Sequence, residues 1–399
     1  MMSLLILCLL TAGFIGFGVV ERVFHQRSLA AVPTRIHVSG TRGKSSVTRL
    51  IASGLREAGI VTAAKTTGTL ARMILPDARE VPIFRPSGPN IIEQTRIIAA
   101  AADMGCQALV IECMALQPEL HWLSENKLIH ATHGVITNAR ADHLDVMGPT
   151  EVDVAKTLAS MTPVGGVLYT AEQRHLDILR EAAADRSTRL VAVDTADIAA
   201  ITDEEIGKFS YTEHKENVAL AWKVLADLGV SREVAFRGMW KTNPDPGALS
   251  VSTVDFFKRR IVFVNGFAAN DPESTERIWR LARQRYPEIK RAVAVFNLRA
   301  DRVSRTSQMA QDTTFWHEAD AVLLMGTGAY HFARMAAKTD YDTGEFIFAD
   351  QLEVDQIFES IVEACTSPVT LVIGMGNIGG QGLPLVRYFK NRALPGEMS

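Results

Sequence analysis

The residues that most clearly could do chemistry form a glycine-rich turn between a short β-branched run, Ile36 to Val38, and a helical apolar pattern that begins at Val47. Backbone N–H groups in such a turn converge on an anion, and the start of the following helix adds positive potential. A lysine in this turn reaches the outer phosphates of a nucleotide, and a serine hydroxyl binds Mg²⁺. A plain helix-capping turn is the alternative. The predicted nucleoside-triphosphate site consists of Gly40, Thr41, Arg42, Gly43, Lys44, Ser45 and Ser46.

Two further strand-like runs end in side chains that suit a metal ion. Glu112 ends the apolar run that begins at Ala108, and the pair Asp142-His143 follows a later strand. Because open α/β sheets bind ligands at the carboxyl ends of their strands, we expect Glu112 to lie beside the phosphate loop and to bind Mg²⁺ together with Ser45. His143 could be a second ligand, with Asp142 as its orienting acid. A capping or surface acid and a structural histidine are the alternatives.

The composition limits the classes of protein that fit. Apolar residues make up 47% of the chain and charged residues 22%, which supports a sizeable core. The formal net charge is −3, and no basic stripe is interleaved with aromatic residues, so we expect no nucleic-acid partner. The four cysteines form no Cys-x-x-Cys pair, which is typical of a reduced compartment without structural zinc or a disulfide framework.

From Pro33 onward the chain alternates between strand-like and helical runs, which predicts a mostly parallel sheet with helices on both faces. Predicted helices include Ile91–Met104, Val152–Met161 and Glu216–Leu228. The turn-rich stretch Asn243–Gly247 predicts a linker. The predicted strands are 36–38, 61–64, 109–111, 134–137, 167–169 and 190–193 before this linker, and 261–264, 292–296, 321–325, 346–348 and 369–373 after it.

These elements predict an α/β protein with a P-loop ATP-binding domain over 33–245 and a smaller Rossmann-like domain over 248–399. Before them, residues 1–28 form a predicted membrane anchor, because Met1 to Val20 carries no charged side chain and about 20 such residues can span a bilayer. Arg22 and Arg27 follow the span, so the catalytic body is expected in the cytoplasm. A signal peptide or a buried helix is the alternative.

The motifs together resemble the Mur ligase superfamily, which includes the folylpolyglutamate synthetases. The segment 40–46 is similar to that family's phosphate loop, 109–112 to its Mg²⁺-glutamate strand, and Thr137 to Asp145 to its histidine-containing segment. The resemblance implies that His143 binds a second Mg²⁺, that Lys156 is carbamylated, and that Asn217 lies near the adenine. The sequence departs from the family at Asn265, where the family has an aspartate.

Within this superfamily, the chain resembles the catalytic subunits of poly-γ-glutamate synthases over essentially its whole length. The segments that carry this resemblance are 85–90, 243–247, 268–272 and 374–380. It implies an ATP-dependent acid–amino-acid ligase that polymerises glutamate through γ-linkages for capsule synthesis. The reaction would pass through an acyl phosphate and release ADP and phosphate.

The resemblance also implies a role for each site residue. Lys44, His143 and Lys156 would be catalytic, with ATP and Mg²⁺ as the cofactors. The expected metal ligands are Ser45, Glu112 and His143. By family position, Arg85, Ser87 and Asn90 are expected to bind substrate. Arg299 and Arg302 are expected to bind glutamate carboxylates because they follow a predicted strand of the second domain, with a solvated charged loop as the alternative.

The expected partners are glutamate, the growing poly-γ-glutamate chain and the membrane subunits of a synthase or export complex. Self-association into a homo-oligomer stays open. Two other functions remain as alternatives: a membrane-tethered P-loop ATPase that drives polymer assembly or export, and a Mur-type ligase for another amino-acid acceptor.

Overall fold

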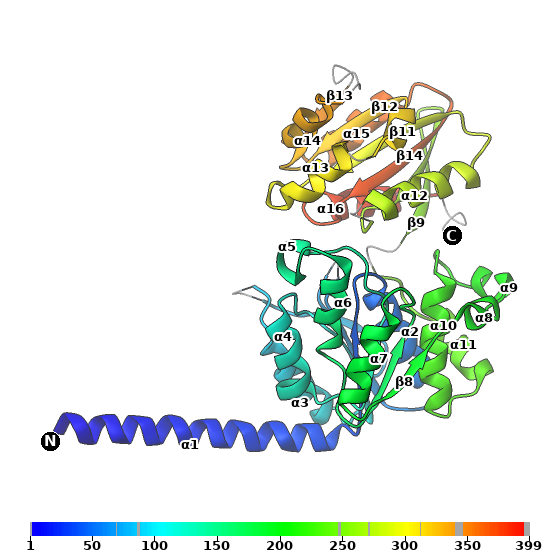
Figure 1. Cartoon of the computed structure of the whole chain (residues 1–399). Helices are drawn as coiled ribbons and strands as arrows, with labels where there is room; N and C mark the ends of the chain where they lie inside the picture. Colours follow the sequence, from blue (N-terminus) through cyan, green and yellow to red (C-terminus); the bar gives the residue numbers. More distant parts are fainter. Residues whose placement is uncertain are drawn as a thin grey trace. The chain divides into compact units, whose positions relative to one another are not determined.

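The computed structural model describes residues 2–68, 70–85, 88–245, 249–269, 272–311, 313–339 and 346–394 (Figure 1). The chain divides into two compact units. The first contains Met1–Lys208 and His214–Asn243, and the second contains Phe209–Glu213 and Pro244–Ser399. The division near Asn243 lies within the stretch expected to be a linker, of which 246–247 fall outside the described residues. The domain limits 33–245 and 248–399 stay a prediction.

The first element is a long apolar helix, α1 (Met2–Ala31), drawn in blue in Figure 1. Its segment Leu4–Ala31 has 28 residues and contains an 18-residue window with a mean hydropathy of 2.3 and no buried residue, so it is long and apolar enough to cross a membrane. A signal sequence near an N-terminus meets the same criteria. The last turns of α1 pack on the first unit, where Leu29 is buried and His25 Nε2 lies 2.7 Å from the carbonyl oxygen of Leu128.

The first unit is built on an eight-stranded sheet of order β4-β3-β2-β5-β1-β6-β7-β8. All neighbouring strands run parallel except β2–β3 and β3–β4, which are antiparallel. The strands are β1 (Thr34–Ser39), β2 (Thr62–Thr66), β3 (Arg72–Ile74), β4 (Glu80–Pro82), β5 (Ala108–Glu112), β6 (His133–Ile136), β7 (Val167–Thr170) and β8 (Arg189–Ala192). The six predicted strands are confirmed, whereas β3 and β4 were not predicted.

Helices flank this sheet, and the three predicted ones begin and end within two residues of the expected bounds. Helix α6 begins at a capping box, in which Thr150 accepts from the backbone N–H of Asp153 and the Asp153 side chain accepts from that of Thr150. The helices are α2 (Lys44–Glu57), α3 (Glu93–Asp103), α4 (Pro118–Leu123), the π-helix η1 (Ser124–Ile129), α5 (Leu144–Met147), α6 (Glu151–Ala159), α7 (Leu176–Asp185), α8 (Thr195–Ala199), α9 (Asp203–Gly207), α10 (Lys215–Asp227) and α11 (Arg232–Trp240).

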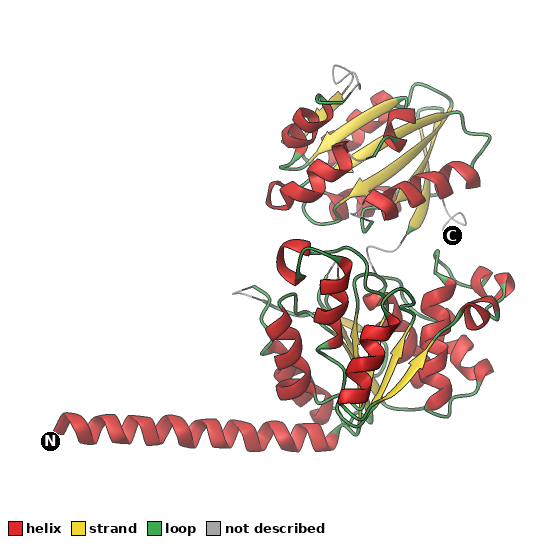
Figure 2. Ribbon diagram, in the orientation of Figure 1, coloured by secondary structure: helices red, strands yellow, loops and turns green. Residues whose placement is uncertain are grey.

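The second unit is also a sheet flanked by helices (Figure 2). Its six-stranded sheet has the order β13-β12-β11-β14-β10-β9. Only β9 runs antiparallel to its neighbour, and it was not predicted. The strands are β9 (Ser250–Phe256), β10 (Arg259–Asn265), β11 (Arg291–Asn297), β12 (Ala321–Met325), β13 (Phe346–Ala349) and β14 (Val369–Gly376). The helices are α12 (Pro272–Arg285), the 3₁₀ turns η2 (Ala300–Arg302) and η3 (Phe315–Glu318), α13 (Val303–Gln311), α14 (Ala329–Ala336), α15 (Val354–Ala364) and α16 (Gly382–Lys390).

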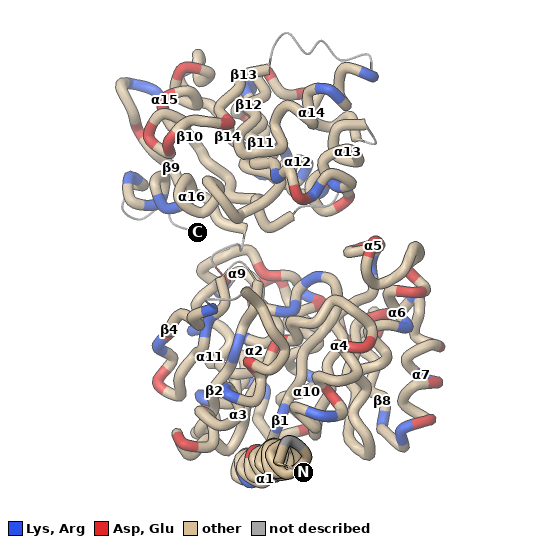
Figure 3. The backbone as a smooth tube through the Cα atoms, turned by 90° about the vertical axis from the view of Figure 1, so that its left-hand side faces the viewer, with Lys and Arg blue, Asp and Glu red and all other residues tan. Residues whose placement is uncertain are grey.

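Both faces of the second sheet are covered, which explains its continuous apolar strands. In β11, Ala294 and Phe296 belong to one buried cluster, and Val293 and Val295 belong to the other. Charged residues of both signs are interspersed along both units (Figure 3). The four cysteines are free thiols.

Candidate active site

The glycine-rich turn joins β1 to α2, as its sequence predicted. Gly40 and Gly43 have φ angles of 131° and 83°, in the region that favours glycine. A Cβ atom on Gly40 would clash with Thr137 Oγ1, and one on Gly43 would lie 2.6 Å from Asn217 Oδ1. Lys44 Nζ donates to the carbonyl oxygens of Gly40 at 2.7 Å and Thr41 at 3.2 Å, so the ammonium lies over the loop.

The predicted metal ligands Ser45 and Glu112 are in direct contact. Ser45 Oγ donates to Glu112 Oε2 at 2.8 Å, and the backbone N–H of Thr67 donates to the same oxygen at 2.7 Å. Glu112 is 1% exposed at the end of β5, which pairs with β1 in parallel. Among the described residues, no group of three or more His, Cys, Asp or Glu side chains could hold a metal. This donor set suits Mg²⁺, which takes few protein ligands besides phosphate oxygens and water.

The end of β6 fixes the phosphate loop through two side chains that sequence reasoning gave no role. Asn138 Oδ1 accepts from Thr41 Oγ1 at 2.6 Å and from the Arg42 backbone N–H at 3.1 Å. Thr137 Oγ1 donates to the Arg42 carbonyl oxygen at 2.6 Å. The signal that could have identified them is that polar side chains directly follow an apolar strand next to β1.

His143 lies on the same segment, at the start of α5. It has a φ of 49°, which is uncommon outside glycine, and its Nε2 lies 3.9 Å from Asp142 Oδ1. Asp142 Oδ2 also lies 3.7 Å from Arg42 Nη1, which connects this segment to the phosphate loop. Lys156 lies in α6 with an exposed side chain, and no hydrogen bond or ion pair joins it to His143 within the described part of the chain. Carbamylation of Lys156 stays a prediction.

Asn217, in the first turn of α10, is 9% exposed and lies against Gly43. A place near the adenine stays a prediction for this residue.

The substrate-side prediction for Arg85 falls in a cluster of charges. Arg85 donates from Nε to Glu93 Oε2 at 2.6 Å and from Nη2 to Oε1 at 2.9 Å, and Lys65 Nζ lies 3.2 Å from the same Oε1. Burial lowers the pKa of Lys65, although Glu93 opposes this shift. Burial alone would raise the pKa of Glu93, but hydrogen bonds and charges from Arg85 and Lys65 lower it. Sequence reasoning missed Lys65 and Glu93; the only signal was a lysine inside an apolar strand.

The other substrate-side predictions show local pairing. Asn90 is exposed and its Oδ1 accepts from the Ile92 backbone N–H at 2.9 Å, whereas Ser87 lies outside the described residues. In the second unit, Arg299 donates from Nε to Asp301 Oδ1 at 2.9 Å, and Arg302 Nε lies 4.0 Å from Asp301 Oδ2. Glutamate binding by these residues stays a prediction.

In the second unit, an asparagine that was not predicted holds the glycine-rich segment 374–380 at the end of β14. Asn297 Nδ2 donates to the Gly379 carbonyl oxygen at 2.6 Å and to that of Asn377. The buried Asn265 donates from Nδ2 to Ser250 Oγ at 3.4 Å.

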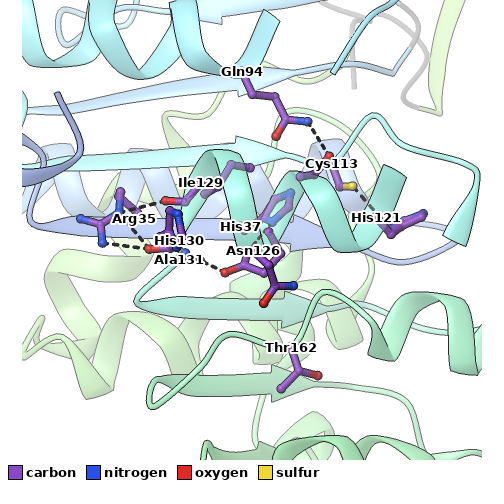
Figure 4. Close-up of polar contacts among 12 residues, drawn as sticks. Arg35, His37, Gln94, Cys113, His121, Asn126, Ile129, His130, Ala131 and Thr162 are labelled. Atoms are coloured by element: carbon purple, nitrogen blue, oxygen red, sulfur yellow. Dashed lines mark hydrogen bonds and ion pairs between the residues drawn. The ribbon is translucent and has the colours of Figure 1, made fainter. Parts of the chain in front are cut away.

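Cys113, the residue after Glu112, belongs to a buried polar cluster with His37 and His121 (Figure 4). His37 Nδ1 donates to Glu125 Oε2 at 2.8 Å, and Cys113 Sγ lies 3.6 Å from His121 Nδ1. Burial opposes the charge on His37, but Cys113 and Glu125 raise its pKa to about 9. Burial would also raise the pKa of the Cys113 thiol, yet His121 and His37 hold it well below its usual value. Glu125 Oε1 accepts from the Ala131 backbone N–H at 2.8 Å.

Comparison with solved structures shows the class of protein that this fold defines. The bifunctional folylpolyglutamate synthase/dihydrofolate synthase of Yersinia pestis, complexed with AMPPNP and Mn, has a TM-score of 0.68 at 14% identity, over 93% of this chain and 92% of that chain. E. coli FolC in complex with DHPP and ADP has a TM-score of 0.64 at 14% identity, over the same shares. The Mur ligase middle domain model matches residues 38–227. The protein is a Mur-type ATP-dependent ligase.

The particular branch follows from closer relatives. The C-terminal domain model of poly-gamma-glutamate synthase CapB matches residues 251–392. The chain is 38% identical over 379 residues to the capsule biosynthesis protein CapB of Bacillus anthracis, covering 94% of this chain and 80% of that protein. It is 37% identical over 394 residues to the PGA synthase CapB of Bacillus subtilis (strain 168), covering 97% of each. The chain belongs to the CapB family of poly-γ-glutamate synthases, which confirms the resemblance and the fold class predicted from the sequence.

Proposed function

We propose that this chain joins glutamate units through γ-amide bonds by way of an acyl phosphate, releasing ADP and phosphate. The observation that carries the proposal is the contact of Ser45 with Glu112 beside a phosphate loop that holds Lys44, in a chain of the CapB family. The two Bacillus relatives are named for capsule biosynthesis and for PGA synthesis.

The chemistry explains why ATP is needed. A carboxylate is a poor electrophile, so one of its oxygens first attacks the γ-phosphorus of ATP, and the bond to ADP breaks. The amine nitrogen of the next glutamate then attacks the acyl carbon, phosphate leaves, and the nitrogen loses its proton. Phosphoryl transfer depends on positioning and charge neutralisation. The loop N–H groups and Lys44 would provide these at the β- and γ-phosphates.

Ser45 and Glu112 would hold Mg²⁺, the metal that we propose for this site. Bound there, the ion would neutralise the phosphate charge that develops during transfer. The solved relatives with this fold contain ADP, or AMPPNP with Mn, which supports ATP with a divalent metal ion. His143 is proposed as the ligand of a second Mg²⁺ with Lys156 as its carbamylated partner, on family position alone.

The remaining proposals concern the substrates. Asn217 is proposed to bind near the adenine, because it lies against the phosphate loop. Arg85, Asn90, Arg299 and Arg302 are proposed to bind glutamate carboxylates, and Ser87 joins them on family position.

The location and the partners of the enzyme follow from α1. We propose that α1 spans the cell membrane and that Arg22 and Arg27 keep the catalytic body on the cytoplasmic side, where ATP is present. A polymer made at this membrane requires a route outward, so partner subunits for synthesis or export are proposed. A homo-oligomer is a further proposal of this kind.

The test follows an oxygen atom in the full-length protein in detergent, supplied with Mg²⁺, ATP and glutamate whose carboxylates carry ¹⁸O. An acyl phosphate must transfer one ¹⁸O from the carboxylate to the released phosphate, which mass spectrometry detects. AMP and pyrophosphate, or unlabelled phosphate released with ADP in a glutamate-dependent reaction, would overturn the acyl-phosphate route. ADP release that ignores glutamate would favour the tethered ATPase. Stimulation by another amino acid alone would favour a ligase for that acceptor.

A further inference from the structure

A compact group of three charged side chains lies at the edge of the first sheet where β2 and β5 end. Lys65 in β2 is completely buried, and its Nζ contacts Glu93 Oε1 at 3.2 Å and Met114 Sδ at 3.4 Å. Arg85 holds both oxygens of Glu93, at 2.6 Å and 2.9 Å, and its side chain is 18% exposed. We name Lys65, Glu93 and Arg85 the charge triad.

The charge triad is unbalanced. It contains two cations and one carboxylate, and Glu93 already accepts from both cations. Glu112 is a further carboxylate that acts on Lys65, but in the proposed function its charge would be taken up by Mg²⁺, which would leave the triad with one positive charge in excess. Excess positive charge in a buried place is costly unless an anion completes it. A carboxylate that approaches the more accessible Arg85 would supply that anion.

The place of the triad connects it to the reaction. Lys65 pairs in register with Ile111, the residue before Glu112. Thr67, two residues after Lys65, donates its backbone N–H to Glu112. The triad and the proposed metal ligand therefore lie at the carboxyl ends of neighbouring parallel strands, where open α/β sheets bind their ligands.

We infer that the charge triad binds the α-carboxylate of the glutamate whose γ-carboxylate is phosphorylated, with Arg85 as the contact and Lys65 as the positioning residue. This inference rests on the proposed function and explains why the new amide bond forms at the γ-carboxylate. A glutamate has two carboxylates, and holding one of them on Arg85 presents the other to the γ-phosphate. Lys65 shares Glu93 with Arg85, so Glu93 neutralises Arg85 only in part and the guanidinium keeps positive charge for the substrate.

The experiment compares ADP release with glutamate and with 4-aminobutyrate, which keeps the γ-carboxylate and the amine but lacks the α-carboxylate. The full-length protein in detergent is used as the wild type, Lys65→Met, Arg85→Gln and the double variant. Arg96→Gln is the matched control, because Arg96 is exposed on the same helix as Glu93.

For wild type and Arg96→Gln, we expect kcat/KM for glutamate to exceed that for 4-aminobutyrate by at least about tenfold, and the single variants to reduce this preference to about twofold. The KM for glutamate should rise about tenfold and that for ATP stay within about twofold. Because Lys65 acts through Arg85, the double variant should resemble Arg85→Gln alone.

An unchanged preference in Arg85→Gln would overturn the inference even if Lys65→Met failed to fold, since Arg85 is partly exposed. Equal losses for glutamate and 4-aminobutyrate in a folded Lys65→Met would also overturn it, by assigning Lys65 a purely structural role. In both cases wild-type ADP release that depends on glutamate would leave the proposed function standing. Wild-type release that ignores glutamate would instead overturn the proposed function, and the inference with it.

Discussion

At the scale of single residues, the surroundings of Glu112 support its proposed role as a metal ligand. Its Oε2 accepts hydrogen bonds from Ser45 Oγ and the Thr67 backbone N–H. These bonds fix the orientation of the group, while Oε1 makes no hydrogen bond to any described residue. A buried carboxylate with one fixed oxygen and one available oxygen suits monodentate binding of Mg²⁺.

Replacing Glu112 by glutamine tests this role, because an amide keeps the shape and loses the charge. We expect glutamate-dependent ADP release in Glu112→Gln to fall at least about a hundredfold, which equals about 2.7 kcal/mol of transition-state stabilisation. The residual rate should require a higher Mg²⁺ concentration, measured by titration after EDTA treatment. Glu119→Gln, at an exposed position on α4, should behave like the wild type. Equal Mg²⁺ dependence in Glu112→Gln and wild type would contradict the assignment.

The buried pair His37 and Cys113 makes a prediction about pH. His37 has a folded pKa of about 9 against a usual 6.5, so its stabilising contribution is complete below 6.5 and is lost as the pH rises through 9. Cys113 has a lowered pKa, so its contribution is complete above the usual 9.0 and is lost as the pH falls through its folded pKa. Where the two pH ranges overlap, the two effects on the free energy of unfolding oppose each other.

Removing the thiol should lower the pKa of His37, because Cys113 is one of the two groups that raise it against burial. We expect the His37 imidazole in Cys113→Ala to lose its proton at a pH at least about one unit below that of the wild type. NMR titration of the imidazole in both proteins measures this difference. An unchanged His37 pKa would contradict the presence of a thiolate–imidazolium pair.

The main residues of the proposed phosphate site could be selected from the sequence, because Gly40, Lys44 and Ser45 are neighbours in sequence and Glu112 ends an apolar strand. The support around it could not. His37 lies on β1, Lys65 on β2 and Cys113 directly after β5, and only the strand order brings them near their partners. A polar residue within an apolar strand was the single available signal, and it names no partner.

At the scale of elements, the phosphate loop depends on close packing behind α2. Gly238 of α11 lies so near α2 that a Cβ atom there would be 2.5 Å from the Ser53 carbonyl oxygen and 2.9 Å from Gly54 Cα. Both contacts are to backbone, which cannot move aside as a flexible side chain could. This contact fixes α11 against the helix that begins at Lys44.

Gly238→Ala should therefore lower the free energy of unfolding by about 2 kcal/mol, because overpacking outweighs the better helix propensity of alanine. The control is Gly207→Ala at the end of α9, where no atom lies within 4 Å of the added Cβ. That variant should be unchanged or stabilised by up to about 1 kcal/mol. Denaturant unfolding measures both, and equal stability of the two variants would contradict the packing argument.

The elements themselves divide into those that sequence periodicity can find and those that it cannot. Buried parallel strands such as β5 and β11 are continuous apolar runs, so they were predicted. Strands β3 and β4 have only three residues each, and their antiparallel pairing beside β2 depends on tertiary contacts. Strand β9 mixes serine, threonine and valine, and it is ordered by pairing with β10.

At the scale of the whole molecule, the proposed membrane location depends on α1. Its apolar side chains are exposed from Leu4 to Phe24. After Phe24, His25 and Leu29 contact the rest of the first unit. Exposed apolar surface of this length is stable in a bilayer.

Two charges in the middle of α1 should release the protein from membranes. The double variant Leu10→Arg with Phe14→Arg costs about 5 kcal/mol of insertion free energy, at about 2.5 kcal/mol for each arginine. We expect the wild type to stay in the membrane fraction after an alkaline wash and the double variant to leave it. Phe257→Arg changes an exposed aromatic residue of the second unit, 86% exposed, and should stay with the wild type. Release of the wild type itself would contradict a membrane span.

The measurement that tests the central claim most directly is ADP release by the full-length protein with Mg²⁺, with and without glutamate, in the wild type, Lys44→Ala and Lys127→Ala. Lys127 is exposed on η1 and serves as the control. We predict that glutamate stimulates ADP release by the wild type and by Lys127→Ala, and that Lys44→Ala loses at least about a hundredfold of that rate. Wild-type release that ignores glutamate, or full activity of Lys44→Ala, would contradict the account.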